Sequence, residues 1–286
     1  MIPRTDKPLE TEAPMRLTAR LLLVVGTLIL TGPTTAQERE YGHEDSITQS
    51  RHELWLTRIR YDSIGGQRHA YYFYDGRWWE RWETDFPQAE QNFAKRLNEL
   101  TSVVASPVPL KRRLTDPRLG DSPLIFMSDV GYMELSGLEI EALRTYLANG
   151  GFLWVDDFWG DAEWASLERA MADVLPGKRW ITLPIEHPIF HTVFDIEQMP
   201  QIPARDYARW GTTEPSFEHR RPTGAMETPS IRAYTDDDGR LMVIATHNTD
   251  IADGWERESY GEWYFENFST KSYRVGINVI VYALSH

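Results

Sequence analysis

The sequence predicts an α/β fold in which a mostly parallel sheet is flanked by helices in three layers. Two continuous apolar runs, Leu124–Met127 and Phe152–Val155, are typical of strands that are buried on both faces. A helical pattern follows each run, so strand and helix alternate over residues 121–176. Units of this kind connect parallel strands and place helices on both faces of the sheet.

The two helices of this segment carry their own start and stop signals. Ser136 and Glu139 have the spacing of a capping box, in which each side chain accepts a hydrogen bond from the other residue's backbone N–H. Asn149-Gly150-Gly151 ends the first helix, because glycine tolerates the left-handed conformation. Asp161 is predicted to cap the second helix, which ends at Pro176-Gly177. The apolar stripes that define the helices are Ile140, Leu143 and Leu147, and then Trp164, Leu167, Met171 and Val174.

Further elements are predicted on both sides of this segment. They are strands at 54–61, 71–74 and 181–183, a helix after Pro87 with Phe93, Leu97 and Leu100 on one stripe, a hairpin of 231–234 with 241–246, and a buried helix at 273–284. Residues 195–229 are irregular and rich in proline, which is typical of a functional loop.

The N-terminal region has the pattern of a secretory signal peptide. Arg16 and Arg20 precede the apolar run Leu21–Leu30, and the small residues 34–36 resemble a cleavage site. We therefore expect a signal peptide over 1–36, with Met15 as an alternative start, and an exported product in the periplasm or outside the cell. An uncleaved anchor or a buried core helix are the alternatives.

The rest of the chain is then a flexible lead-in over 37–53 and a single domain over 54–286, with no membrane span after removal of the signal. The formal net charge of −13 makes nucleic acid an unsuitable partner, because phosphate binding relies on a surplus of Lys and Arg. The 286 residues include no cysteine, which excludes disulfides, cysteine–zinc sites and thiol nucleophiles.

Several stretches together resemble the bacterial family known as domain of unknown function 4159. They are Asp121–Leu124, Gly150–Gly160 (GGFLWVDDFWG), His187–His191 (HPIFH) and His247–Glu256 (HNTDIADGWE). The resemblance covers about residues 54–284, and it implies a flavodoxin-like fold similar to that of class I glutamine amidotransferases. In those enzymes the turn after the corresponding strand bears a catalytic cysteine. Here Asp156–Trp159 occupies that place, so the amidotransferase reaction does not carry over.

Polar residues at the carboxyl ends of the predicted strands are the first candidates for a site, because ligands bind there in open α/β sheets. Asp156 and Asp157 could bind a polar ligand, hold a hard metal or act as a catalytic acid and base. Asp129 and Tyr132 follow the neighbouring strand and would face the same edge. The alternative for each carboxylate is a local turn or cap.

The densest polar cluster follows the last strand of the hairpin. It contains His247, Asn248, Asp250, Asp253, Trp255 and Glu256, and a crevice lined by these groups could bind a polyol or a cation through oxygens, although the spacing is not that of an EF-hand loop. With Trp159, the residues of this cluster other than Glu256 complete the predicted ligand-binding set. The alternative is a set of loop-stabilising carboxylates with Trp255 packed on the core. His187 and His191 are four residues apart and are weak candidates for metal ligands; a capping role for His187 is the better interpretation, because Pro188 follows it.

Residues 71–82 contain seven aromatic side chains, which would stack on sugars or on a partner protein if exposed and would cover a sheet edge if buried. Our first hypothesis is an exported module that binds a polar small molecule or glycan, such as a cell-envelope component. The alternatives are a hydrolase, with or without a divalent metal, that uses Asp156 and Asp157, and a scaffold for envelope proteins. No other cofactor is expected.

Overall fold

The computed structural model describes residues 53–64, 70–74, 76–204, 207–208 and 228–286. The predicted signal peptide, almost all of the lead-in and most of the proline-rich stretch 195–229 lie outside the described residues, so those predictions stand as they were made. Within the described ranges, no helix combines the length and the apolar character that crossing a membrane requires.

A seven-stranded sheet forms the centre of the domain. Its order is β5 (Leu110–Arg112), β1 (Thr57–Ile59), β6 (Leu124–Ser128), β8 (Phe152–Asp156), β11 (Leu241–His247), β10 (Ser230–Thr235) and β9 (Ile181–Thr182). The first five strands are parallel, whereas β10 is antiparallel to both of its neighbours. Counted along the chain, the parallel strands have the order 2-1-3-4-5, which is the flavodoxin-like order.

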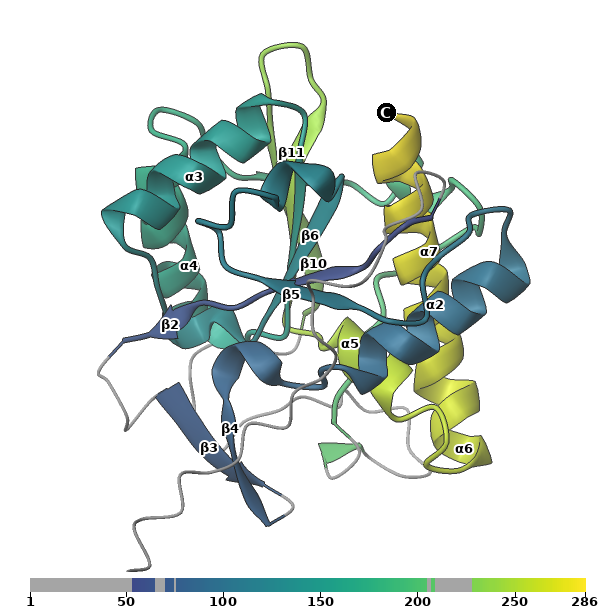
Figure 1. Ribbon diagram of the computed structural model, residues 1–286. Helices are drawn as coiled ribbons and strands as arrows, with labels where there is room; N and C mark the ends of the chain where they lie inside the picture. Colours follow the sequence, from purple (N-terminus) through teal and green to yellow (C-terminus); the bar gives the residue numbers. More distant parts are fainter. Residues whose placement is uncertain (1–52, 65–69, 75, 205–206, 209–227) are drawn as a thin grey trace, which may run out of the picture. The chain divides into compact units, whose positions relative to one another are not determined.

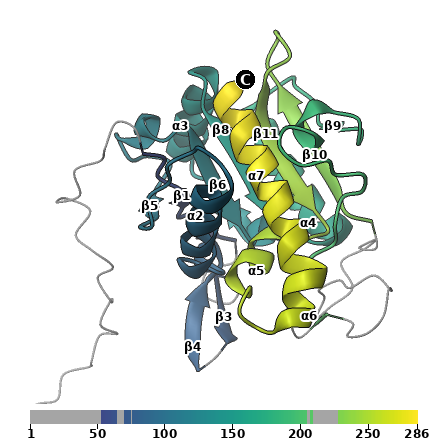
Figure 2. The same cartoon turned by 90° about the vertical axis from the view of Figure 1, so that its right-hand side faces the viewer.

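Helices cover both faces of this sheet (Figures 1 and 2). On one face lie α2 (Gln88–Leu100), α5 (Ile251–Glu256) and α7 (Thr270–Ser285), and on the other lie α3 (Gly137–Ala148) and α4 (Gly160–Val174). The strand residues alternate between the two cores: Phe126 and Trp154 pack toward α2, α5 and α7, and Met127 and Val155 toward α3 and α4. The predicted three-layer α/β fold is thus confirmed.

The capping box of α3 is present, but the predicted cap of α4 was wrong. Ser136 N–H donates to Glu139 Oε2 at 3.0 Å, and Glu139 N–H donates to Ser136 Oγ at 3.4 Å. The helix α4 begins at Gly160, so Asp161 lies inside its first turn and cannot cap it. Glu163 supplies the acceptor instead, since its Oε2 receives the N–H of Trp159 at 2.7 Å.

Smaller elements surround the strand ends. The pairs β2 (Asp62–Ser63) with β7 (Met133–Glu134) and β3 (Tyr71–Tyr74) with β4 (Arg77–Glu80) form two small antiparallel sheets. The single strand predicted over 54–61 is divided, because only Thr57–Ile59 pairs in the central sheet. A short helix α6 (Glu262–Tyr264) and a π-helical turn (Phe265–Ser269) lead into α7. The stripe predicted for α2 ends at Leu97, since Leu100 at the helix end is exposed.

Two glycines allow α5 to lie close to its neighbours. A Cβ on Gly254 of α5 would lie 2.4 Å from the Cβ of Ser272 on α7, and one on Gly276 of α7 would lie 2.6 Å from the ring of Trp255 on α5. Both distances are too short for real contacts, so larger side chains would push the helices apart. The close packing fixes α5 at the carboxyl ends of the strands.

Candidate functional site

Each of the three central strands is followed by an Asp or Asn with a left-handed backbone. Asp129 (φ 54°) follows β6, Asp157 (φ 54°) follows β8, and Asn248 (φ 61°) follows β11. Among the described residues, the only other non-glycine residue with positive φ is Asp85 (φ 64°). Such conformations cost energy in most residues and cluster at functional sites. Three of these residues, Asp129, Asp157 and Asn248, stand at the carboxyl ends of the strands, where open α/β sheets bind ligands.

Asp156, the last residue of β8, is bonded inside the protein through both oxygens. Its Oδ1 accepts a short hydrogen bond from Thr246 Oγ1, and its Oδ2 accepts the backbone N–H of Ala252 at 3.0 Å. Burial raises the pKa of this carboxyl to about 7. Asp156 therefore connects β8 to β11 and to the start of α5. This matches the alternative of a local cap that the sequence analysis left open for this carboxylate.

Asp157 and Asn248 connect the loops that follow β8 and β11. Asp157 Oδ1 accepts the indole N–H of Trp159 at 3.1 Å. Asn248 Oδ1 accepts the N–H of Gly160 at 2.8 Å, and its Nδ2 donates to the carbonyl of Thr228 at 3.0 Å. These bonds hold both loops in place at the edge of the sheet.

Asp129 forms an ion pair with Arg81, whose Nη1 lies 2.8 Å from the Oδ2 of Asp129. The guanidinium carbon of Arg81 also lies 4.8 Å from the ring centroid of Tyr132. Burial raises the pKa of Asp129, and the nearby Arg81 opposes that shift. The predicted residues Asp129 and Tyr132 are thus joined through a cation that the sequence analysis did not identify.

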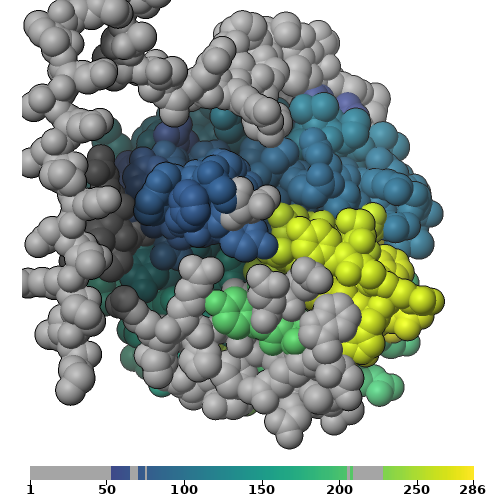
Figure 3. Space-filling model, turned by 90° about the horizontal axis from the view of Figure 1, so that it is seen from below, coloured from purple at the N-terminus to yellow at the C-terminus, as the bar shows by residue number. Residues whose placement is uncertain are grey.

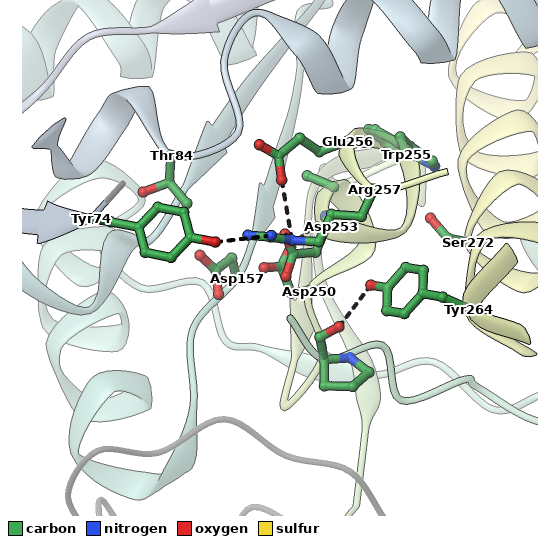
Figure 4. A network of polar contacts seen from close by, with 12 residues as sticks. Tyr74, Thr84, Asp157, Asp250, Asp253, Trp255, Glu256, Arg257, Tyr264 and Ser272 are labelled. Atoms are coloured by element: carbon green, nitrogen blue, oxygen red, sulfur yellow. Dashed lines mark hydrogen bonds and ion pairs between the residues drawn. The ribbon is translucent and has the colours of Figure 1, made fainter. Parts of the chain in front are cut away.

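The helix α5 carries a second polar group (Figure 4). Asp250 caps the helix by accepting the N–H of Asp253 at 2.9 Å. Arg257 Nε lies 2.5 Å from Asp253 Oδ1 and 3.1 Å from Glu256 Oε2. Its Nη1 is 3.3 Å from the hydroxyl of Tyr74 on the hairpin β3–β4.

Asp85, just before α2, joins this group from a distant part of the chain. One carboxylate oxygen each of Asp85, Asp253 and Glu256 lies within 4.8 Å of the others. Burial and the neighbouring Asp253 and Glu256 raise the pKa of Asp85 well above its ordinary value. Burial and Asp253 likewise raise the pKa of Glu256 to about 7. We call Asp85, Asp253 and Glu256 the acidic triad.

The hairpin β3–β4 has an inner and an outer aromatic face. On the inner face, Tyr72 makes a hydroxyl–hydroxyl hydrogen bond of 3.0 Å with Thr84. Burial, and then the carboxylates of Asp85, Asp129 and Asp157, raise the pKa of Tyr72 well above its ordinary value. In Figure 3 the blue surface of the segment around residue 80 meets the yellow surface of the segment around residue 260.

The outer face of the hairpin is open to solvent. Tyr71, Phe73 and Trp78 are exposed, and Phe73 packs edge-on against Trp78 with ring centroids 5.4 Å apart. The aromatic segment thus combines the two roles that the sequence analysis left open. The rings of the inner face cover neighbouring parts of the protein, and the exposed rings of the outer face are available to a ligand or a partner protein.

Two residues of the predicted ligand-binding set are packed into the cores. His247 stacks on Phe158 at 4.9 Å and its Nε2 is 3.0 Å from the carbonyl of Gly160, while burial lowers its pKa to about 4. Trp255 packs against Phe93 and Trp154. For both residues the geometry favours the packing interpretation.

The histidine pair lies against α7, away from the carboxylates. His187 Nδ1 accepts the N–H of Ile189 at 3.2 Å, as expected of a cap, and its ring is 5.7 Å from that of Tyr282. His191 contacts Asp195 Oδ1 at 3.2 Å and the carbonyl of Ile185 at 2.9 Å.

The sequence analysis missed Asp85, Arg81, Glu163 and Arg257. Glu163 lies beside Gly131 and Asp129, and burial followed by the Asp129 charge raises its pKa to about 7. Asp85 had one signal, its position two residues before the proline that precedes α2. Arg257 could have been found from its position, because it directly follows the acidic segment HNTDIADGWE.

Comparison with known proteins supports the family resemblance. The family model described as a domain of unknown function (DUF4159) matches residues 68–284, which include every strand-end residue discussed above. No curated protein matches the chain.

Proposed function

The chain belongs to the family described as a domain of unknown function (DUF4159), and from this premise we propose that it binds a polar, hydroxyl-rich ligand such as a carbohydrate or another cell-envelope component. One observation carries the proposal. Carboxylates follow each of the three central strands, namely Asp129 after β6, Asp157 after β8 and Asp250 after β11, and Asp85 from a distant segment lies within 4.8 Å of Asp253 and Glu256 on α5. Convergence of this kind is typical of ligand sites in open α/β sheets.

The chemistry of the site suits such a ligand. Carboxylates accept hydrogen bonds from hydroxyl groups, and Arg81 and Arg257 could donate to ring or glycosidic oxygens. Tyr72 and Tyr74 on the inner face of the hairpin supply aromatic surface beside these groups. The combination of acids, guanidinium groups and rings is what recognition of a sugar requires.

The setting that we propose for this binding is the cell envelope. The pattern of residues 1–36 supports export to the periplasm or the exterior, where envelope glycans are available. The exposed outer face of the hairpin supports the alternative role as a scaffold for envelope proteins, because exposed aromatic rings are favourable contact surface.

A glycan panel tests the proposal directly. We expect the purified full chain to bind at least one class of envelope glycan, and the substitution Asp157→Ala to weaken that binding at least tenfold. Asp173→Ala on the outside of α4 is the matched control, since Asp173 is exposed and lies outside the site. Absence of binding across the panel, or equal binding by Asp157→Ala, would contradict the proposal.

The hydrolase alternative is favoured by one feature, the carboxyl of Glu256. A pKa of about 7 allows Glu256 to give or take a proton at neutral pH, which a general acid or base must do. The internal bonds of Asp156 make it a poorer candidate than the sequence suggested. Release of a shortened glycan during the panel incubation would favour a hydrolase over a binding module.

A further inference from the structure

The acidic triad contains buried oxygens that no group of the described chain satisfies. Asp85 is 7% exposed and Asp253 is 1% exposed, yet Oδ2 of each residue has no hydrogen-bond partner among the described residues. Glu256 Oε2, in contrast, lies in the ion pair with Arg257 at 3.1 Å. A buried unpaired carboxylate oxygen is costly, so two in one place indicate a missing partner.

The charges point to a cation as that partner. Within the described ranges, the one guanidinium that pairs with these carboxylates is that of Arg257, which already contacts Asp253 and Glu256. With the triad ionised, two negative charges remain uncompensated. A divalent cation would balance them, and carboxylate oxygens are the ligands that hard divalent cations prefer.

The preferred coordination geometries favour Ca²⁺ over Mg²⁺ here. One oxygen of each carboxylate lies within 4.8 Å of the other two. Ca²⁺ accepts irregular sets of oxygen ligands at about 2.3–2.6 Å, whereas Mg²⁺ demands near-ideal octahedral geometry at about 2.0–2.1 Å. Three carboxylates from two separate segments therefore suit Ca²⁺ better. Glu256 is partly exposed, which gives an ion a route of entry.

We propose that Asp85, Asp253 and Glu256 hold a calcium ion between the start of α2 and the helix α5. This site goes beyond the glycan-binding proposal and does not depend on it. The ion would join two segments that are far apart in the chain, and water would complete its coordination.

Calorimetric titration of the full chain with CaCl₂, after removal of metals by a chelator, tests the site. We expect one Ca²⁺ per chain, tighter binding of Ca²⁺ than of Mg²⁺, and a higher melting temperature with Ca²⁺ present. Asp85→Asn and Glu256→Gln should each weaken binding at least tenfold, whereas the matched control Asp173→Asn should bind as the wild type does. Because no glycan is present, failure here leaves the glycan proposal intact.

Crystals of the wild-type protein soaked in MnCl₂ give a second measurement that needs no variant to fold. An anomalous peak between the three carboxylates would support the site. The proposal would be overturned by the absence of Ca²⁺ binding to the folded wild type, by unchanged binding in both variants, or by a peak elsewhere only.

Discussion

Two groups of acids lie at the same edge of the sheet, and they differ in how their charges are satisfied. On the β6 and β8 side, Asp129 has Arg81 at 2.8 Å and Asp156 has Thr246 and the N–H of Ala252. In the acidic triad on the α5 side, one buried oxygen each of Asp85 and Asp253 has no hydrogen-bond partner in the part of the chain that the structure describes. The first group is explained by the fold alone, and the second is not.

The pairing of the oxygens separates carboxylates with a structural role from carboxylates that are available to a ligand. Burial raises the pKa of Asp129, Asp156 and Asp85 alike, so burial does not distinguish the groups. The hydrogen-bond and ion-pair partners of each oxygen do distinguish the two groups. Truncation of a partnered acid should destabilise the fold, whereas truncation of an unpartnered acid should not. Substitutions in each group test this difference.

The largest expected effect is the pH dependence of Asp156→Asn. The Asp156 carboxyl has a folded pKa of about 7 against an ordinary value of 3.8, so the folded state holds a proton that the unfolded state has lost between these values. Wild-type stability should therefore fall as the pH rises through 7, by about 4 kcal/mol in total. Asparagine can still accept from Ala252 N–H and donate to Thr246, so the variant should lack this loss.

Urea unfolding at pH 4.5, 6, 7.5 and 9 would measure this effect. The difference in unfolding free energy between Asp156→Asn and the wild type should grow in favour of the variant with pH, while Asp173→Asn tracks the wild type. A difference that stays constant over this range would show that Asp156 is ionised in the fold throughout.

A smaller loss is expected for Asp129→Ala at neutral pH. The substitution takes the carboxylate away from the largely buried Arg81 and places alanine at a φ of 54°, which together should cost about 2–3 kcal/mol. Chemical denaturation would measure the loss. In the Arg81→Ala background the same change should cost less, because no cation is left behind. Equal costs in both backgrounds would assign the loss to the backbone alone.

The sequence predicted most of the fold because its signals are local. Continuous apolar runs predicted β6 and β8, and the capping box of Ser136 predicted α3. The position of β1 between β5 and β6 depends on pairing between distant segments, which no local pattern specifies. The sequence analysis took Asp161 as the cap of α4, whereas the helix begins at Gly160. Glu163, one turn inside the helix, accepts the N–H of Trp159 instead, and a local pattern does not distinguish these two acids.

The site was predicted in part for the same reason. The rule that ligands bind at strand ends selected Asp129, Asp157 and Asn248, which the structure places at one edge with left-handed backbones. Asp85 was missed because it follows a hairpin rather than a central strand, and only folding brings it to α5. The strand pattern also could not show that Asp156 points into the protein while its neighbour Asp157 turns away in a left-handed loop.

The smallest expected effect has the opposite sign to that of Asp129→Ala. Asp85→Asn, measured at pH 8 in the presence of a chelator, should raise the unfolding free energy by about 1 kcal/mol. Burial and the neighbouring Asp253 and Glu256 raise the pKa of Asp85, so the wild type loses stability as the pH rises, and asparagine removes that loss. Asparagine accepts the φ of 64° at this position, so no backbone cost is added. Thermal and urea unfolding would measure the gain, with Asp173→Asn as the control. In millimolar Ca²⁺ the gain should disappear, since the wild type alone retains all three ligands of the ion. A loss of stability in the chelator would show that the charge of Asp85 is compensated in the fold, as that of Asp129 is by Arg81, and would remove the distinction between the two groups.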